Sequence, residues 1–259
     1  MKKNYLLMAV AVLGLAACSN ELKDNPVNPT VRNVPAGVEA VDLGLTSGTK
    51  WANMNVGATK VTGFGTYFAW GETKGYTVNP ETNGDEGATY SKNLFSWETY
   101  AWCNGTTSTF TKYCPTGSAD RWDADTNGGT PDGKTQLAYA DDAVRVNWGA
   151  SWRMPTKADF DELLAQTNAE WVADYEGTGV AGYKFMNKSD AAKFIFLPAA
   201  GCLGKDGYYG KGTGGGYWSS TLTSDDPRNA YDLYFGSDYL GSEGYYRFYG
   251  QSVRAVQKN

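Results

Sequence analysis

The chain has 259 residues, of which 41% are hydrophobic and 20% are charged, and its formal net charge is −5. This acidic balance argues against a nucleic-acid-binding protein, because such proteins normally carry a basic patch or stripe. The chain contains no histidine, which excludes Ser-His-Asp and Cys-His catalysis and histidine-ligated zinc.

Residues 1–17 have the composition of an export signal. Two lysines follow Met1, and an apolar run covers 5–17, which is too short to span a bilayer as a helix. The run ends in Leu-Ala-Ala-Cys at 15–18, which resembles the lipobox of bacterial lipoproteins. That resemblance implies cleavage before Cys18 and a diacylglycerol on its sulfur, and two or more acyl chains make a stable membrane anchor. The alternatives are an uncleaved anchor and an ordinary signal peptide.

Residues 18–37 form the predicted flexible tether. The segment contains three prolines and several asparagines but no aromatic residue, so it cannot bury enough apolar area to fold. The acidic residues Glu21 and Asp24 lie close behind Cys18, which loosely resembles the signal that directs lipoproteins of Bacteroides-type bacteria to the outer face. We therefore expect an outer-membrane protein that is lipid-anchored and displayed on the cell surface.

Residues 38–259 are predicted to form a single domain, because they contain no linker and no repeat. A hairpin is expected to join 41–45 to 49–54. The span 76–135 is polar and irregular, with a short helix expected near 94–102, and two further helical turns are expected at 141–147.

The clearest helix begins after Pro155. Thr156 and Asp159 have the spacing of a capping box, and Phe160, Leu163 and Leu164 then share one face. The remaining segments are expected to be strands, at 182–185, 193–197, 216–219, 230–235, 245–248 and 252–256. A few early helices and many late strands, in a chain rich in glycine and aromatic residues, predict an α+β fold.

Three cysteines lie in the predicted domain. Cys103 and Cys114 are close in the sequence, and a Gly-Thr-Thr-Ser turn lies between them, which makes them candidates for a disulfide. Cys202 follows an apolar stretch and is expected to be a buried free thiol. No CxxC pair occurs, so a thiol redox enzyme or a thiolate zinc site has little support.

An acidic stretch in the irregular region resembles the first half of a calcium-binding loop. Asp123, Asp125 and Asn127 stand where the first ligands would be, and Gly128 follows them. The twelfth position is Lys134, where a bidentate Glu is expected. A structural calcium is therefore one interpretation, and a solvated acidic loop with Asx turns is the other. No other cofactor is expected.

Residues 224–250 combine a few apolar positions with many Tyr, Asp, Ser and Gly residues. Antibody loops use the same residues, because tyrosine gives a large contact area at little cost in conformational entropy and Ser and Gly adapt their geometry. The alternative is an ordinary strand region that buries one face. The predicted ligand-binding residues are Asp232, Tyr234, Gly236, Asp238, Tyr239, Ser242, Glu243, Tyr245, Tyr246 and Tyr249.

Several motifs occur together in a fixed order. They include Val-Asp-Leu-Gly-Leu at 41–45, Trp-Arg-Met-Pro-Thr at 152–156 and Tyr-Trp-Ser-Ser at 217–220; the others lie at 48–52, 67–73, 141–149, 196–201 and 251–254. This set resembles the Fibrobacter succinogenes major paralogous domain family. The resemblance implies a C-type-lectin-like fold with two or three short helices, a distorted antiparallel sheet and long irregular insertions. The family is more distantly similar to formylglycine-generating enzymes, but their late pair of cysteines is absent here.

The C-terminal composition also resembles the variable proteins of diversity-generating retroelements. Our prediction is an adhesin or receptor, not an enzyme, whose partner is a protein or glycan ligand, with a pilus subunit as one candidate and no nucleic acid. The alternatives are a polysaccharide-acting enzyme, an accessory carbohydrate-binding protein and a structural envelope protein. The carboxylate pairs Glu72 with Glu98 and Asp159 with Glu162 give little support to an enzyme, since 28 acidic residues produce such pairs by chance.

Overall fold

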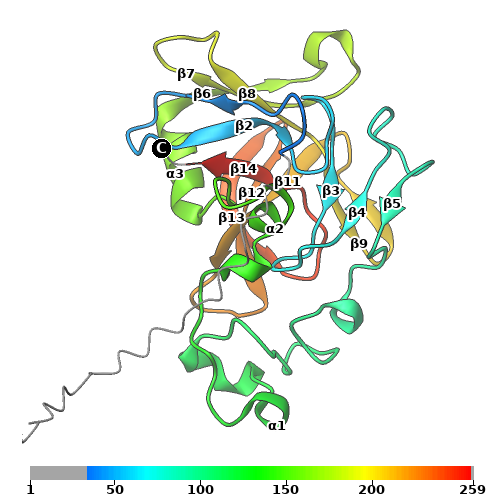
Figure 1. Cartoon of the computed structure of the whole chain (residues 1–259), viewed down its shortest axis with the longest axis vertical. Coiled ribbons are helices and arrows are strands. Elements are labelled where there is room, and N and C mark those ends of the chain that lie inside the picture. Colours follow the sequence, from blue (N-terminus) through cyan, green and yellow to red (C-terminus); the bar gives the residue numbers. More distant parts are fainter. Residues whose placement is uncertain (1–33, 258–259) are drawn as a thin grey trace, which may run out of the picture.

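The computed structural model describes residues 34–257, in which small antiparallel sheets are combined with a few short helices (Figure 1). This mixed content confirms the predicted α+β class. The proposed lipidation site, Cys18, and most of the tether lie outside the described residues. None of the helices within 34–257 has the length and apolar character needed to cross a membrane.

The two ends of the domain are joined in one sheet. Strand β2 (Lys50–Asn55) pairs with β1 (Ala40–Val41) on one side and with β14 (Arg254–Gln257) on the other. The β1–β2 pairing confirms the predicted hairpin, although the first strand is shorter than expected.

Four further sheets surround this one. Two of them have three substantial strands, made of β6 (Thr167–Val172), β7 (Gly182–Asn187) and β8 (Phe194–Pro198), and of β11 (Gly214–Leu222), β12 (Asn229–Gly236) and β13 (Tyr239–Tyr246). The others have short strands, namely β3 (Thr66–Tyr67), β4 (Tyr76–Thr77) and β5 (Thr89–Tyr90), and β9 (Cys202–Gly204) with β10 (Gly207–Tyr209). The sequence did not predict β4, β5, β6, β9 or β10, and it placed β13 several residues too late.

The helices are short. They are α1 (Ala124–Asn127), α2 (Ala143–Trp148) and α3 (Lys157–Gln166), with 3₁₀ turns at Trp97–Thr99, Thr116–Arg121, Tyr139–Asp141 and Tyr175–Gly177. The segment that carries α1 projects from the lower end of the molecule in Figure 1. In place of the helix expected near 94–102, the structure has only one 3₁₀ turn.

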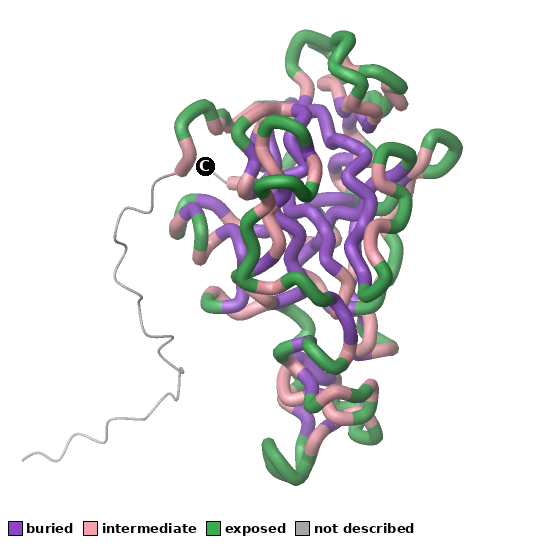
Figure 2. Tube along the Cα trace, turned by 90° about the vertical axis from the view of Figure 1, so that its right-hand side faces the viewer, coloured by how far each residue is buried: buried purple, intermediate pink, exposed green. Residues whose placement is uncertain are grey.

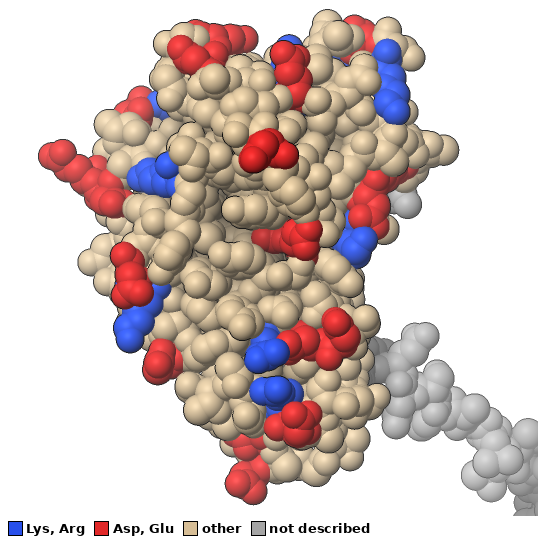
Figure 3. All heavy atoms as spheres, turned by 180° about the vertical axis from the view of Figure 1, so that it is seen from behind, with Lys and Arg blue, Asp and Glu red and all other residues tan. Residues whose placement is uncertain are grey.

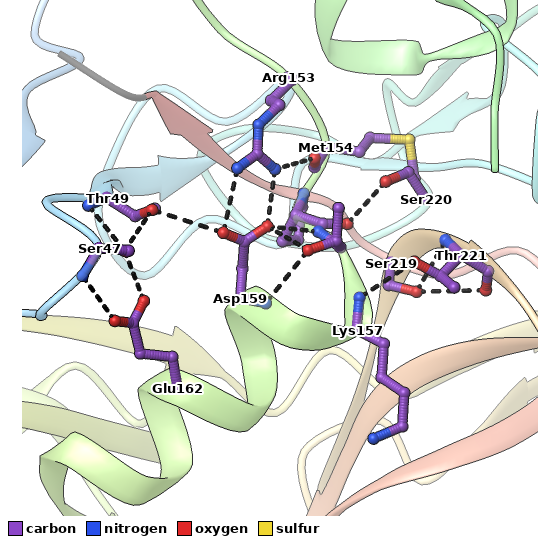
Figure 4. A network of polar contacts seen from close by, with 12 residues as sticks. Ser47, Thr49, Arg153, Met154, Lys157, Asp159, Glu162, Ser219, Ser220 and Thr221 are labelled. Carbon is purple, nitrogen blue, oxygen red and sulfur yellow. Dashed lines mark hydrogen bonds and ion pairs between the residues drawn. The ribbon is translucent and has the colours of Figure 1, made fainter.

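The start of α3 confirms the predicted capping box (Figure 4). The Thr156 hydroxyl accepts from the Asp159 amide at 3.2 Å, and the Asp159 carboxylate accepts from the Thr156 amide at 2.7 Å. Arg153 adds an ion pair to the same carboxylate at 2.7 Å. These bonds satisfy donors that a helix N-terminus otherwise leaves unpaired, so the position of α3 is fixed.

Buried segments concentrate in the central body of the molecule, and exposed segments lie at its periphery (Figure 2). Two indoles tie the core together, because Trp70 Nε1 donates to the Ser219 carbonyl and Trp218 Nε1 to the Phe68 carbonyl, each at 2.8 Å. The tryptophans that lie inside the family-like motifs are all buried; they are Trp51, Trp70, Trp148, Trp152 and Trp218.

The predicted disulfide between Cys103 and Cys114 is wrong, since both residues are buried free thiols. Each thiol faces a nearby carbonyl instead: Cys103 Sγ lies 3.3 Å from the Trp97 oxygen and Cys114 Sγ lies 3.4 Å from the Ser118 oxygen. Burial raises the pKa of Cys114 to about 11, so this thiol is neutral and unreactive at neutral pH. Cys202 is also a buried free thiol, as predicted.

The calcium-like stretch at 123–128 forms an N-cap and a short helix, which agrees with the interpretation as an acidic segment with local capping bonds. Asp123 is the N-cap of α1, and its carboxylate accepts from the Thr126 amide and hydroxyl at 3.0 Å each. Asp125 and Asn127 lie within the helix rather than in a loop that could converge on an ion. Residues 34–257 contain no group of three acidic or cysteine side chains that could hold a metal. The local capping geometry therefore uses the oxygens that a cation would need.

Candidate binding surface

The C-terminal region that the sequence singled out forms the β12–β13 hairpin. The two strands pair without interruption from Asn229↔Tyr246 to Gly236↔Tyr239. Strand side chains alternate between faces, and Leu233 and Phe235 point into the core, where both are fully buried. One face of the hairpin is thus fixed by packing, while the other buries Ala230 and Asp232 and exposes Tyr234 and Tyr239.

Five tyrosine rings form a connected row on the second face. Tyr234 contacts Tyr239 and Tyr245, with ring centroids 6.0 and 6.5 Å apart. Tyr249 extends the row from Tyr245 at 4.9 Å, and Tyr209 of β10 contacts Tyr249 at 5.9 Å. We call this row, Tyr209, Tyr234, Tyr239, Tyr245 and Tyr249, the tyrosine face. Its most exposed members on the hairpin are Tyr234, which is 42% accessible, and Tyr239, which is 41% accessible.

The structure places most predicted ligand-binding residues at or near the surface. Tyr234, Asp238, Tyr239, Glu243 and Tyr246 are exposed, and Gly236, Ser242, Tyr245 and Tyr249 are partly buried. Ser242 and Tyr246 belong to the opposite face of β13, because Ser242 pairs with the core residue Leu233 and Tyr246 is offset from it by four residues.

Asp232 was predicted to contact a ligand directly, and this is wrong, because the residue is 0% exposed. It lies on the same side of β12 as Tyr234, but Gln251 covers it and donates to its Oδ2 at 2.8 Å. Its Oδ1 has no partner among the described residues, and neither does Oε1 of Gln251. Burial raises the pKa of Asp232 to about 8, and the nearby charge of Glu243 contributes in the same direction.

Two contributors to this surface were not predicted. Tyr209 is 44% exposed and is supplied by the β9–β10 hairpin, which the Lys-Asp-Gly turn at 205–207 could have indicated. Gln251 lies against Gly216, where an added Cβ would stand 2.8 Å from the amide carbon of Gln251. The glycines of 214–216 are therefore buried residues of β11 that admit Gln251, and the strand begins two residues earlier than the sequence predicted.

A second region with concave surface borders the irregular segment. One groove of about 470 Å³ is lined by Thr66, Tyr90 and Trp148 among others, and a neighbouring one of about 650 Å³ by Glu72, Lys92 and Trp102 among others. In the second groove Lys92 donates to both oxygens of Glu72, at 2.7 and 2.9 Å. The charges of Lys92 and Glu72 thus neutralise each other within the protein. These two side chains therefore offer a ligand less than the unpaired polar atoms beside the hairpin do.

One family model matches part of the chain. Residues 174–256, which contain β7 to β13 and the tyrosine face, match the model of a domain of unknown function, DUF8237. No curated protein and no solved structure matches the chain significantly. The match covers the C-terminal third of the chain. The β12–β13 hairpin and the strands that support it therefore belong to a sequence unit that also occurs in other proteins.

Proposed function

We propose that the protein is a surface-displayed, lipid-anchored outer-membrane protein that binds an external ligand through the tyrosine face, as an adhesin or receptor. The observation that carries this proposal is the row of five contacting tyrosine rings, three of them on a hairpin whose other face packs on the core. Rigidly supported tyrosines offer a large amphipathic contact area and lose little entropy on binding. The proposed ligand is either a protein, for example a pilus subunit, or a glycan.

The anchor and the cell-surface location rest on the lipobox-like sequence that ends at Cys18. Protease treatment of intact cells tests the location. Cleavage of the protein on intact cells supports surface display, and full protection of a protein that is cleaved after lysis contradicts it.

We further propose a C-type-lectin-like fold of the type found in retroelement-diversified proteins. The pairing of β2 with β14 and the long irregular segment 76–135 support the fold. The separation of a buried framework from exposed Tyr, Asp and Gly positions supports diversification. Sequencing codons 220–250 in sister isolates tests it: changes should cluster at exposed positions such as Tyr239 and spare Leu233 and Phe235, whereas an invariant stretch without a nearby near-copy contradicts diversification.

The binding surface is tested with an array of glycans and bacterial and host surface proteins. A Tyr234→Ser/Tyr239→Ser double variant is expected to lose at least about tenfold in affinity for any partner of the wild-type protein, because truncated aromatic anchors cost about 2 kcal/mol or more. Tyr90→Ser is the matched control, since Tyr90 is 59% exposed but lies on β5. Equal binding by the double variant and the wild-type protein would sink the proposal.

A further inference from the structure

The tyrosine face is acidic at its centre. Residues 229–246 contain Asp232, Asp238 and Glu243 but no Lys or Arg. Asp232 and Glu243 are directly opposite each other in the β12–β13 register. Acidic side chains that face each other across a strand pair are destabilising unless a base compensates them. Elsewhere, on the face seen in Figure 3, Lys and Arg side chains mostly lie beside acidic ones, but the hairpin supplies no such neighbour of its own.

Two buried oxygen atoms lack partners at this point. Asp232 Oδ1 and Gln251 Oε1 are both buried and both without a donor among residues 34–257. Unpaired buried acceptors are costly, so native proteins rarely leave two of them together. When Asp232 is ionised, its unpaired Oδ1 can only accept, so the ionised state of this cluster favours a positive charge nearby, beside the exposed Glu243.

The surrounding rings favour the same kind of group. The Tyr239 hydroxyl donates to Glu243, so this ring and this carboxylate are held together. Tyr234 lies beside Tyr239 and stacks on Tyr245 with an interplanar angle of 10°. The faces of aromatic rings attract ammonium and guanidinium ions, and a set of rings with carboxylates is the usual recognition site for such cations.

We propose that the tyrosine face binds a lysine or arginine side chain of a protein partner, with the cationic head beside Glu243 and against the exposed rings of Tyr234 and Tyr239. The exposed Glu243 makes the direct contact, and Asp232 acts from beneath through its charge. A basic side chain fits better than a bare ion, because its methylene stem packs on the rings while its head reaches the carboxylates. This inference rests on the proposed function and adds the chemistry of the partner.

The free and bound states should differ in the proton on Asp232. Since burial raises the pKa of this carboxyl to about 8, the free protein holds it mostly neutral at pH 7, and a bound cation favours ionisation. Affinity is therefore expected to rise from pH 6 to pH 8.5. The other titratable groups that face Asp232 are Glu243, Tyr239, Tyr245 and Cys202, and the last three have pKa values raised above their ordinary range.

The test is titration calorimetry of the full-length protein with Gly/Ser-based peptides that differ at one central residue. Peptides with Lys or Arg are expected to bind, and those with acetyl-lysine or Glu to bind at least about tenfold more weakly. Glu243→Gln and Asp232→Asn are each expected to reduce the affinity for the Lys peptide, and Asp232→Asn to abolish its rise with pH. Glu86→Gln, at an exposed acid in another loop, is the control and should change nothing.

The inference is overturned if the Lys and Arg peptides do not bind at millimolar concentration. It is also overturned if the acetyl-lysine peptide binds equally well, or if neither Glu243→Gln nor Asp232→Asn changes the affinity for the Lys peptide. The array partners separate this failure from that of the proposed function. If the binding of a partner requires Tyr234 and Tyr239 but is unaffected by Glu243→Gln and Asp232→Asn, only the proposed recognition of a cation is contradicted. A partner that ignores all four residues contradicts the binding surface itself.

Discussion

The Asp232→Asn variant is expected to be more stable than the wild-type protein at pH 8, and the difference should shrink towards pH 4. The carboxyl is fully buried and its pKa is raised from 3.8 to about 8. Between these values the folded state keeps a proton that the unfolded state has released, so the free energy of unfolding falls as the pH rises. The slope for one such group approaches about 1.4 kcal/mol per pH unit. The amide preserves the volume and the bond to Gln251 but cannot ionise.

Urea denaturation at pH 4.5, 6 and 8 measures this effect. The comparison between variant and wild type isolates Asp232, because other buried acids such as Asp142, whose pKa burial also raises, titrate in both proteins. Asp238→Asn is the control, because Asp238 is exposed in the turn of the same hairpin. Its free energy of unfolding should follow that of the wild-type protein at all three pH values. A difference between Asp232→Asn and wild type that does not change with pH would show that the carboxyl is not held neutral by burial.

Arg254→Ala is expected to lower the free energy of unfolding by at least about 3 kcal/mol. Arg254 is fully buried in β14. Its guanidinium donates to Asn55 Oδ1 at 2.9 and 2.7 Å, and to the backbone carbonyls of Ala52 and Phe196 at 3.0 and 2.8 Å. One side chain thus ties β14 to β2 and β8. Its removal takes donors away from three acceptor groups and opens a cavity the size of a long side chain.

Chemical denaturation at pH 7 checks the prediction. Burial lowers the pKa of Arg254 to about 10, so the side chain is charged at this pH in both folded and unfolded protein. Arg121→Ala is the matched control, since Arg121 makes only a surface ion pair with Asp120 at 3.2 Å, and its effect should stay within about 1 kcal/mol. A loss for Arg254→Ala no larger than that of the control would mean that the β14 connection contributes little to stability.

The sequence predicted features that depend on neighbouring residues. The helix after Pro155 was predicted correctly, because the Thr156–Asp159 capping box and the apolar face of Phe160 and Leu163 are local signals. The strand β12 was located because Leu233 and Phe235 alternate with polar residues. The same alternation correctly indicated Leu233 and Phe235 as framework positions but missed the burial of Asp232.

Long-range packing could not be predicted. The burial of Asp232 depends on Gln251, which is 19 positions away, and on the close approach that Gly216 permits. The calcium and capping interpretations of 123–128 could not be separated from the sequence, because a calcium loop and an N-cap use the same residue types, and the helix at 124–127 is apparent only in the structure. The ring contact between Tyr209 and Tyr249 joins two separate hairpins and has no signature in either segment.

The central claim is that a partner binds on the tyrosine face, and tyrosine nitration read by mass spectrometry tests it most directly. The full-length protein is treated with and without a saturating partner recovered from the array. Protection is expected at Tyr234 and Tyr239, while Tyr90, the most exposed of the large hydrophobic side chains among residues 34–257, should be nitrated equally in both samples. Protection at Tyr90 with unchanged nitration of Tyr234 and Tyr239 would contradict the account and place the partner at the grooves beside the irregular segment.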